Sequence, residues 1–269
     1  MNAPIQPNAV AQAAHDVRWQ RILDCVALKQ PDRMPTAFYA TFWLAKKYGG
    51  ISCKELMYDY EKTKELAERA VLEFEPDACA PIVAAVASGR SLEAIGFKQL
   101  QWPGHGVDEN QPFQYLDREY MLADEYDEFL FDPTGFYLHK YLPRVASAFE
   151  GIDQLPIFPG LHYFRLINGI RPFAKPEVRA SFERIIRAAE EVETFAGHAA
   201  DFNARIKAQG FPLINGVNAV SPYDFIADYF RGATGMMKDL YRKKDKLLEL
   251  LDKASIFLTR QTKIGRAHV

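Results

Sequence analysis

The sequence predicts an α/β protein with a parallel sheet, and within that class the N-terminal half of a (β/α)8 TIM barrel with its helices. Three short apolar runs, of the kind seen in buried parallel strands, alternate with amphipathic helical segments. No G-x-G-x-x-G phosphate loop follows any of these runs, which favours a barrel over a doubly wound sheet. A barrel needs eight strands, so three candidates predict only its first part.

Composition narrows the class of protein further. The chain has 269 residues, of which 48% are hydrophobic and 25% charged, and this favours one large α/β domain. The net charge of −2 gives no electrostatic reason to expect nucleic acid or a membrane as a partner. The N-terminus lacks the features of a signal peptide, and no apolar run reaches the ~20 residues of a membrane span. Cys25, Cys53 and Cys79 show no C-x-x-C spacing and predict reduced thiols, so we expect a cytoplasmic protein.

The first third of the chain predicts two strands among helices. The expected elements are, in order, a flexible tail over 1–14, a helix over 15–30, a strand over 33–39, a helix over 40–50, a helical region over 52–77 and a strand over 78–87. Pro31 ends the first helix, and Gly49 and Gly50 close the second. The run ACAPIVAAVA at 78–87 is nearly all apolar, which is typical of a buried parallel strand.

The middle of the chain has a different character. Residues 96–135 are rich in proline, glycine and aromatic residues, which is typical of a lid or a binding loop, and Asp124 marks one helix start within them. A long helix is predicted over 175–210, with Pro176 in its first turn and Gly210 at its end. The last expected elements are a strand over 211–220 and two helices within 221–258, separated by Gly232 and Gly235.

Three segments resemble the uroporphyrinogen decarboxylase family, which also holds cobalamin-dependent methyltransferases. They are RILDCVALKQPDRMPTAFY near the N-terminus, FDPTGFYLHKYLPR in the middle, and SPYDFIADYFRGATGMMKDLYRKKDKLLELLDK near the C-terminus. The resemblance covers most of Arg21 to Leu258. It implies a cytosolic (β/α)8 barrel enzyme, whose active site lies at the carboxyl ends of the strands.

The last residues suggest why only part of a barrel is predicted. The segment IGRAHV, Ile264 to Val269, resembles the translation of a sequencing adapter whose preceding bases would complete the codon of Lys263. We therefore expect 263–269 to be an artefact, and 15–262 to be an incomplete barrel domain that lacks its C-terminal half. Such a fragment would leave two sheet edges unpaired and is not expected to be a competent enzyme.

The segment NGVNAVSPYDFIADYFRG, residues 215–232, is similar to a family signature with a Pro-aromatic turn before a Tyr and a Gly. The resemblance implies substrate-binding roles for Asn218 and Tyr223. Where the family has a Thr and its active-site Tyr, this chain has Asp224 and Asp228, the two candidate catalytic carboxylates. Tyr229 lies one residue beyond. Ser221 and Asp224 also fit a helix N-cap, and both alternatives are open.

A tetrapyrrole with several carboxylates needs several cations around it. The family's Arg-rich entry is replaced here by aromatic residues in PTAFYATFWLAKKYGG. Arg90, Arg231 and Lys140 are the candidate substrate-binding cations, with plain surface solvation as the alternative. His105, between two glycines, is the candidate general acid, with an ordinary exposed loop histidine as the alternative.

The resemblance implies decarboxylation of a tetrapyrrole carboxylate in porphyrin metabolism, a carboxy-lyase reaction that needs no cofactor. One alternative is corrinoid-dependent methyl transfer, with a zinc ion whose ligands would lie in the missing half, so no metal site is expected in this chain. Another is a non-catalytic protein that binds a tetrapyrrole or corrinoid. The partners implied are that small molecule, a corrinoid protein in the methyltransferase case, and a second copy in a homodimer.

Overall fold

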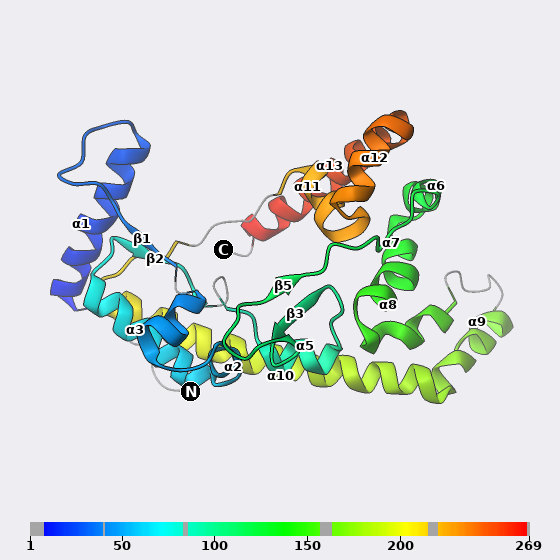
Figure 1. The fold of residues 1–269 in the computed structure, drawn as a ribbon, viewed down its shortest axis with the longest axis horizontal. Coiled ribbons are helices and arrows are strands. Elements are labelled where there is room, and N and C mark those ends of the chain that lie inside the picture. The colour runs from blue at the N-terminus through cyan, green and yellow to red at the C-terminus, as the bar shows by residue number, and fades with distance from the viewer. Residues whose placement is uncertain (1–7, 40, 83–85, 157–162, 215–219, 268–269) are drawn as a thin grey trace. The chain divides into compact units, whose positions relative to one another are not determined.

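The computed structural model describes residues 8–39, 41–82, 86–156, 163–214 and 220–267 (Figure 1). Within these ranges the chain is mixed α/β, mostly helical with a few short strands. It divides into two compact units. Unit 1 consists of Met1–Leu92, Trp102–Phe113 and Ala189–Gly216, and unit 2 of Glu93–Gln101, Gln114–Ala188 and Val217–Val269. Each unit has a core of its own.

Helix α1, Ala9–Val26, opens unit 1 and begins earlier than the predicted start at His15. The side chain of Asn8 accepts a hydrogen bond from the backbone N–H of Ala11, which satisfies a donor that the first turn leaves unpaired. The prediction of a tail is therefore wrong for residues 9–14, and residues 1–7 lie outside the described residues. The missed signal is an Asn in front of an alanine-rich run.

The strands of unit 1 are much shorter than predicted. Strand β1 is Ala37–Phe38 and strand β2 is Ala78–Cys79, and they pair in parallel through Ala37–Ala78 and Phe38–Cys79. The third predicted strand contributes one parallel bridge between Leu213 and Cys79. Residues 83–85 and 215–219, in the remainder of the second and third predicted strands, lie outside the described residues. The predicted lengths are thus not seen, but the three segments do pair in parallel.

Between β1 and β2 the chain forms four helical elements. They are the 3-10 helix η1 at Phe42–Leu44, the π-helical turn η2 at Ala45–Gly49, α2 at Cys53–Tyr58 and α3 at Tyr60–Phe74. Ser52 and Glu55 form a capping box on α2, and the Asp59 side chain accepts from Lys62 N to start α3. These two caps divide the single helical region predicted over 52–77.

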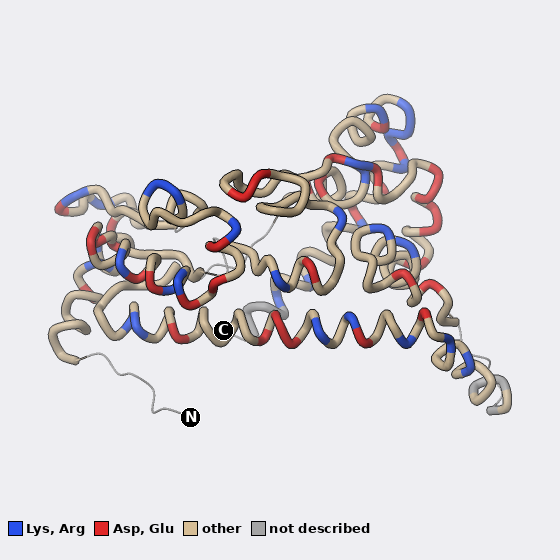
Figure 2. Tube along the Cα trace, turned by 60° about the horizontal axis from the view of Figure 1, so that its bottom comes forward, with Lys and Arg blue, Asp and Glu red and all other residues tan. Residues whose placement is uncertain are grey.

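The core of unit 1 forms where α3 packs against the C-terminal half of α10, Pro176–Ala208. The rings of Tyr60 and Phe195 lie 4.9 Å apart, and buried apolar side chains continue along both helices. Ion pairs flank this contact, since Lys64 binds Asp201 at 2.6 Å and Arg205 binds Glu68 at 2.7 Å. Charged residues are spread along the whole of α10 (Figure 2), as the solvated face of a long helix requires.

Several short elements follow β2. They are α5 at Gly89–Ile95, β3 at Leu100–Pro103, β4 at Gly106–Val107 and β5 at Gln114–Tyr115. Trp102 and Pro103 of β3 pair with β4 in unit 1, whereas Leu100 and Gln101 pair in antiparallel with β5 in unit 2. The region predicted as a lid or binding loop is therefore a small sheet followed by helices.

The middle of unit 2 is a chain of short helices. They are α6 at Tyr126–Phe131, α7 at Pro133–Phe136, the π-helical turn η3 at Tyr137–Tyr141, α8 at Leu142–Val145, the 3-10 helix η4 at Ser147–Gln154, α9 at Tyr163–Gly169 and the 3-10 helix η5 at Arg171–Ala174. The first half of α10 follows them. Its start at Pro176 and its end next to Gly210 confirm the long helix predicted from the sequence.

The C-terminal part of unit 2 contains α11 at Pro222–Ile226, the π-helical turn η6 at Ala227–Arg231, α12 at Ala233–Arg242 and α13 at Lys244–Ala267. Gly232, with φ of 71°, separates η6 from α12, as predicted. Gly235 lies inside α12, and the second break falls at Lys243 instead. Helix α13 continues to Ala267, into residues 263–269 that the sequence analysis predicts to be an artefact.

The core of unit 2 is formed by buried side chains from these C-terminal helices and from α6 to α8. Within it, the ring centroids of Tyr141 and Phe230 lie 4.3 Å apart.

Candidate functional site

The parallel segments of unit 1 give the chain a defined carboxyl edge. Ala80 N donates to Phe38 O at 2.9 Å, Cys79 N to Pro212 O at 3.0 Å, and Ile214 N to Cys79 O at 2.8 Å. The three segments therefore run side by side in chain order, and their last residues meet at one edge. Ligands of parallel α/β folds bind at the carboxyl ends of the strands, so this edge is the first place to look for a site.

Tyr39 is the exposed residue that follows β1 at this edge. Ala80, after β2, is buried and carries no chemistry. Cys79 lies within the ladder, and burial raises the pKa of its thiol to about 12, so it is not a nucleophile at neutral pH. Burial likewise raises the pKa of Cys53. Among the described residues of this edge, the side chain available to a ligand is therefore the phenol of Tyr39, which is uncharged, and not a cation.

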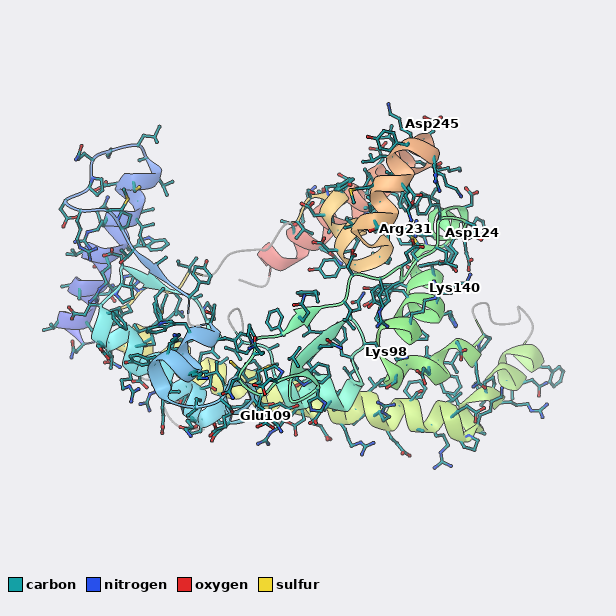
Figure 3. The ribbon with its side chains drawn as sticks, in the orientation of Figure 1. Lys98, Glu109, Asp124, Lys140, Arg231 and Asp245 are labelled. Atoms are coloured by element: carbon teal, nitrogen blue, oxygen red, sulfur yellow. The ribbon has the colours of Figure 1, made fainter. Side chains whose placement is uncertain are left out.

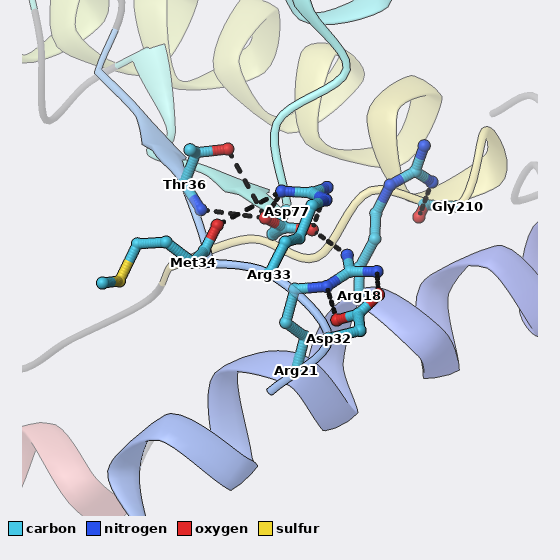
Figure 4. Close-up of polar contacts among 8 residues, drawn as sticks. All are labelled: Arg18, Arg21, Asp32, Arg33, Met34, Thr36, Asp77 and Gly210. Carbon is cyan, nitrogen blue, oxygen red and sulfur yellow. Dashed lines mark hydrogen bonds and ion pairs between the residues drawn. The ribbon is translucent and has the colours of Figure 1, made fainter. Parts of the chain in front are cut away.

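The opposite, amino edge is held by a buried carboxylate. Asp77 precedes β2, has 0% of its side chain exposed and accepts hydrogen bonds from Thr36 N at 2.8 Å and from Arg33 at 2.7 Å (Figure 4). Arg21 of α1 is its second cationic partner, and Arg21 also binds Asp32 at 2.6 Å. Burial alone would raise the pKa of Asp77, but Thr36 N–H and the two guanidinium groups outweigh burial and lower it.

Arg18 adds a third tie between α1 and this edge. Its guanidinium donates to the carbonyl of Gly210 at 2.6 Å and lies 3.9 Å from the ring centroid of Phe211 (Figure 4). Burial lowers the pKa of Arg18. Arg18, Arg21 and Arg33 stand beside Glu75, Asp32 and Asp77, so the charges balance. We assign this cluster to stability rather than to ligand binding.

His105, the candidate general acid, lies in unit 1 inside an aromatic stack. Its ring is 4.7 Å from that of Trp102 and 6.3 Å from that of Tyr58, with both pairs nearly parallel. Trp102 Nε1 donates to Tyr58 Oη at 3.1 Å, and Trp102 N donates to His105 O at 3.0 Å in the turn that Gly104 allows. These contacts favour a packing role for the ring, which is the alternative that the sequence left open.

Arg90, a candidate substrate-binding cation, is exposed in unit 1 and lies 5.3 Å from the ring centroid of Tyr60. The Tyr60 hydroxyl is 2.5 Å from Ser88 Oγ, which caps α5 through Ser91 N at 3.1 Å. Burial raises the pKa of Tyr60. Arg90 therefore keeps hydrogen-bonding capacity, and it is the one candidate cation without an ion pair among the described residues.

Arg231, the second candidate cation, is locked inside unit 2 with 2% of its surface exposed. This side chain, labelled in Figure 3, binds Asp239 at 2.8 Å and Glu119 at 3.0 Å. It also donates to Tyr126 Oη at 3.0 Å and to Met121 O at 2.7 Å. Burial alone would lower the pKa of Arg231, but Glu119 and Asp239 outweigh burial and raise it. Every direction of the guanidinium is occupied, so no substrate carboxylate can reach it.

Lys140, the third candidate cation, pairs with Glu128 and, at 3.4 Å, with Glu125. The hydrogen bond to Glu128 is the main reason why the pKa of Lys140 is raised. Arg144 binds both oxygens of Glu125, at 2.6 and 2.7 Å, and together with Leu122 N lowers the pKa of Glu125 to about 2 despite burial. Lys140 thus belongs to an ion-pair network between η3 and the start of α6.

The candidate signature turn lies in unit 2, at α11 and η6. Asp224 N donates to Ser221 Oγ at 3.1 Å, and Ser221 Oγ donates to the Asp224 carboxylate at 2.8 Å. This is the N-cap of α11, so the capping alternative is the one that the geometry supports for Asp224. Tyr223 is half-buried beside it, and Asn218 lies outside the described residues.

Asp228 is exposed on η6, and the half-buried Tyr229 follows it. Gln99 Nε2 donates to Tyr229 O at 2.9 Å, and the Gln99 side chain also accepts from Tyr141 Oη at 3.3 Å. The next residue, Leu100, pairs with Tyr115 of β5. Burial raises the pKa of Tyr115, and nearby Tyr229 and the negative charge of Asp228 raise it further. An accessible carboxylate and two phenols are thereby gathered in unit 2.

Tyr115 is the one member of this group that the sequence did not single out. Its only signal is an aromatic residue in the segment PFQYLD of the predicted binding loop. A carboxylate with neighbouring phenols can accept hydrogen bonds from a ligand and relay a proton, which is acid–base chemistry. Asp228 therefore remains a candidate catalytic group, with Tyr115 and Tyr229 beside it.

Among the described residues, no group of three or more His, Cys, Asp or Glu side chains is arranged to hold a metal ion. In the same part of the chain, every helix is too short or too polar to cross a bilayer. Comparison with protein-family models, with curated proteins and with solved structures finds no match to this chain.

Proposed function

We propose that this protein is a divergent member of the uroporphyrinogen decarboxylase superfamily, a carboxy-lyase that acts on a tetrapyrrole carboxylate. The observation that carries the proposal is the order of the parallel segments in unit 1: β1, β2 and Leu213 are neighbours in chain order, with helices in each connection. A (β/α)8 barrel begins in this way. In this proposal unit 1 holds its first strands.

Asp228 is the group proposed to act on the substrate. Its carboxylate is accessible and has Tyr229 and Tyr115 nearby, which suits hydrogen bonding to pyrrole N–H groups. The family resemblance implies a Tyr where this chain has Asp228. The π-helical turn η6, Ala227–Arg231, holds one more residue than an α-helical turn, so it can absorb the one-residue offset of Tyr229.

Decarboxylation in this setting needs no cofactor. The bond between the side-chain carbon and its carboxylate breaks, carbon dioxide leaves, and the electron pair that stays on the substrate is protonated. Asp224 is assigned to capping, and His105 to aromatic packing, so neither carries a chemical step in this proposal.

Corrinoid-dependent methyl transfer is the second candidate, and one observation favours it. Arg231 and Lys140 are held in ion pairs, so the number of cations free for a polyanionic substrate is small. The described residues do not fit a zinc ion, and no step is therefore routed through one. A protein that binds a tetrapyrrole or corrinoid without turnover is the third candidate.

Turnover assays separate these candidates. The protein is incubated without oxygen with uroporphyrinogen, and the products are oxidised and counted for carboxylates by chromatography. Methylcobalamin with a thiol is tested separately by its visible absorbance. Products with fewer carboxylates support the first candidate, loss of methylcobalamin supports the second, and binding without turnover supports the third. Failure to bind either ligand would contradict all three.

Asp228→Asn tests the proposed site within whichever assay succeeds. We expect turnover to fall by about 100-fold or more, because acid–base groups contribute 10²–10⁴-fold. Asp224→Asn is the matched control, and it should keep activity near that of the wild type because Asn also caps a helix. Equal activity of the two variants would remove Asp228 from the mechanism.

A further inference from the structure

Unit 2 carries a group of exposed apolar side chains on neighbouring helical elements. It lies on α9, η5 and the first turns of α10, and its apolar side chains are 37–62% exposed: Ile167, Ile170, Phe173, Phe182 and Ile186. The rings of Phe173 and Phe182 stack with centroids 5.7 Å apart, which joins η5 to α10. Exposed apolar residues gathered in this way mark a surface that meets another molecule.

The same surface is strongly basic. Between Ile167 and Ala188 the chain has five cations and two carboxylates, although its overall net charge is −2. Arg171, Arg179 and Arg187 are exposed, and none of them forms an ion pair within the described ranges. We call residues 167–188 the basic–apolar surface. Its partner should be apolar at the centre and acidic around it.

Unit 2 also presents a surface of the opposite character, at α6. From Leu122 to Asp132 the chain has five carboxylates and no cation. Phe131 is 91% exposed, and Leu122 and Asp124 are exposed as well (Figure 3). Lys140, Arg144 and Lys246 pair with three of the carboxylates, and Lys243 donates to the carbonyl of Ala123 at 2.8 Å. Asp124 and Asp132 form no ion pair among the described residues, so this surface keeps two uncompensated carboxylates. We call residues 122–132 the acidic–apolar surface.

We propose that the basic–apolar surface of one copy binds the acidic–apolar surface of a second copy of this chain. Both surfaces have exposed apolar side chains that a contact would bury: Phe173 and Phe182 on the basic–apolar surface, and Phe131 and Leu122 on the acidic–apolar surface. The positive charges of the first surface are complementary to the negative charges of the second. Four of the five cations are Arg, whose guanidinium groups bind carboxylates in pairs of hydrogen bonds. Glu177 and Glu183 lie among these cations, which disfavours an anionic lipid surface.

The two surfaces differ, so the contact is head-to-tail. Each copy that joins leaves one basic–apolar and one acidic–apolar surface free at the ends of the assembly. The assembly therefore grows with protein concentration and shrinks as salt screens the charges. A symmetric dimer would show neither continued growth nor free ends.

Two variants test this directly, by light scattering coupled to size-exclusion chromatography. The first, Arg179→Glu with Phe182→Ser, removes the basic–apolar surface. The second, Phe131→Ser with Asp124→Lys, removes the acidic–apolar surface. All four positions are exposed, and far-UV circular dichroism verifies the fold. We expect the wild type to assemble, each variant alone to be monomeric, and an equimolar mixture of the two to form a dimer.

Tyr241→Ser is the matched control, since Tyr241 is an exposed aromatic residue on α12 outside both surfaces, and it should assemble like the wild type. A monomeric wild type at its highest soluble concentration would overturn the proposal. So would a mixture of the two variants that stays monomeric. Binding of the wild type to phosphatidylserine vesicles without self-assembly would also overturn it, and would assign the basic–apolar surface to lipid.

Discussion

At the scale of single residues, the charged side chains with the largest expected effect on stability are the buried ones. Asp77 in unit 1 and Arg231 in unit 2 each bind two or more partners that are distant in sequence. A charge taken out of water is stable only when such partners compensate for its lost hydration. Substitution of either residue should therefore change stability before it changes any chemistry.

Asp77→Asn should lower the free energy of unfolding by about 3 kcal/mol, since it leaves Arg21 next to a neutral side chain in a buried site. Urea denaturation followed by circular dichroism measures the change. Asp32→Asn is the matched control, because Asp32 binds the same Arg21 from an exposed position, and its effect should be much smaller. Equal effects of the two substitutions would contradict the assignment of Asp77.

The same carboxylate predicts how stability depends on pH. The pKa of Asp77 is lower in the folded protein than in the unfolded chain, so the unfolded chain binds more protons. The stabilisation is fully present above the unfolded pKa of Asp, near 3.9, and is lost as pH falls through the folded value. We therefore expect the free energy of unfolding of the wild type to decrease as the pH is lowered below about 4. The Asp77→Asn variant should show a smaller decrease over the same pH range.

Arg231→Met should cost about 3–5 kcal/mol of unfolding free energy, because Asp239 would keep its buried charge without a counter-ion. Replacing both Arg231 and Asp239 by apolar residues should cost less than replacing Arg231 alone. The double-mutant cycle is measured by urea denaturation. A stable Arg231→Met protein that has lost tetrapyrrole binding would instead make Arg231 a ligand-binding residue.

The sequence could predict these residues as charged, but not their partners. Arg231 was a candidate for substrate binding because a tetrapyrrole with several carboxylates needs cations, yet its partner Glu119 lies more than 100 residues earlier in the chain. For Asp77 the sequence does carry a signal, an acidic residue directly before an apolar run. Pairing over such separations is set by the fold and cannot be read from local spacing.

At the scale of elements, helix α10 was the most predictable part of the chain. Pro176 suits a first turn because its missing N–H has no partner to lose there, and Gly210 ends the segment with φ of 81°. The π-helical turns η2, η3 and η6 were not predictable, since an extra residue in a turn leaves no mark in the hydrophobic period. The strands were over-predicted because apolar runs alone do not fix strand length.

Two glycines of this helical segment should respond to alanine in opposite ways. Gly210→Ala should destabilise unit 1 by about 1–3 kcal/mol, because the left-handed conformation disfavours a side chain and a Cβ would overlap the carbonyl oxygen of Ala11. Gly197→Ala should stabilise the protein by about 0.5–1 kcal/mol, since Gly197 lies inside α10 with open space around it. Urea denaturation measures the change in unfolding free energy for each variant. If both substitutions stabilised the protein, or both destabilised it, the roles assigned to these two glycines would be wrong.

At the scale of the whole molecule, the chain consists of two units with separate cores. The sequence predicted one domain over 15–262, and its mixture of helices and parallel segments is seen, although three short parallel segments are far less sheet than the predicted half-barrel. The parallel order in unit 1 could be predicted because helical segments separate the apolar runs. The division into units could not, since the chain passes from one unit to the other after Leu92, Gln101, Phe113, Ala188 and Gly216, so no single linker separates them.

The central claim is that this chain binds a tetrapyrrole through the carboxylate of Asp228 on η6. The most direct measurement is a titration of the purified protein with uroporphyrin, followed by the shift of its main visible absorption band. We predict saturable binding with one site per chain, weakened several-fold by Asp228→Ala and unchanged by Tyr241→Ala, since Tyr241 is exposed on α12 outside the proposed site. An absorption band that does not shift at any protein concentration, or equal binding by both variants, would contradict the claim.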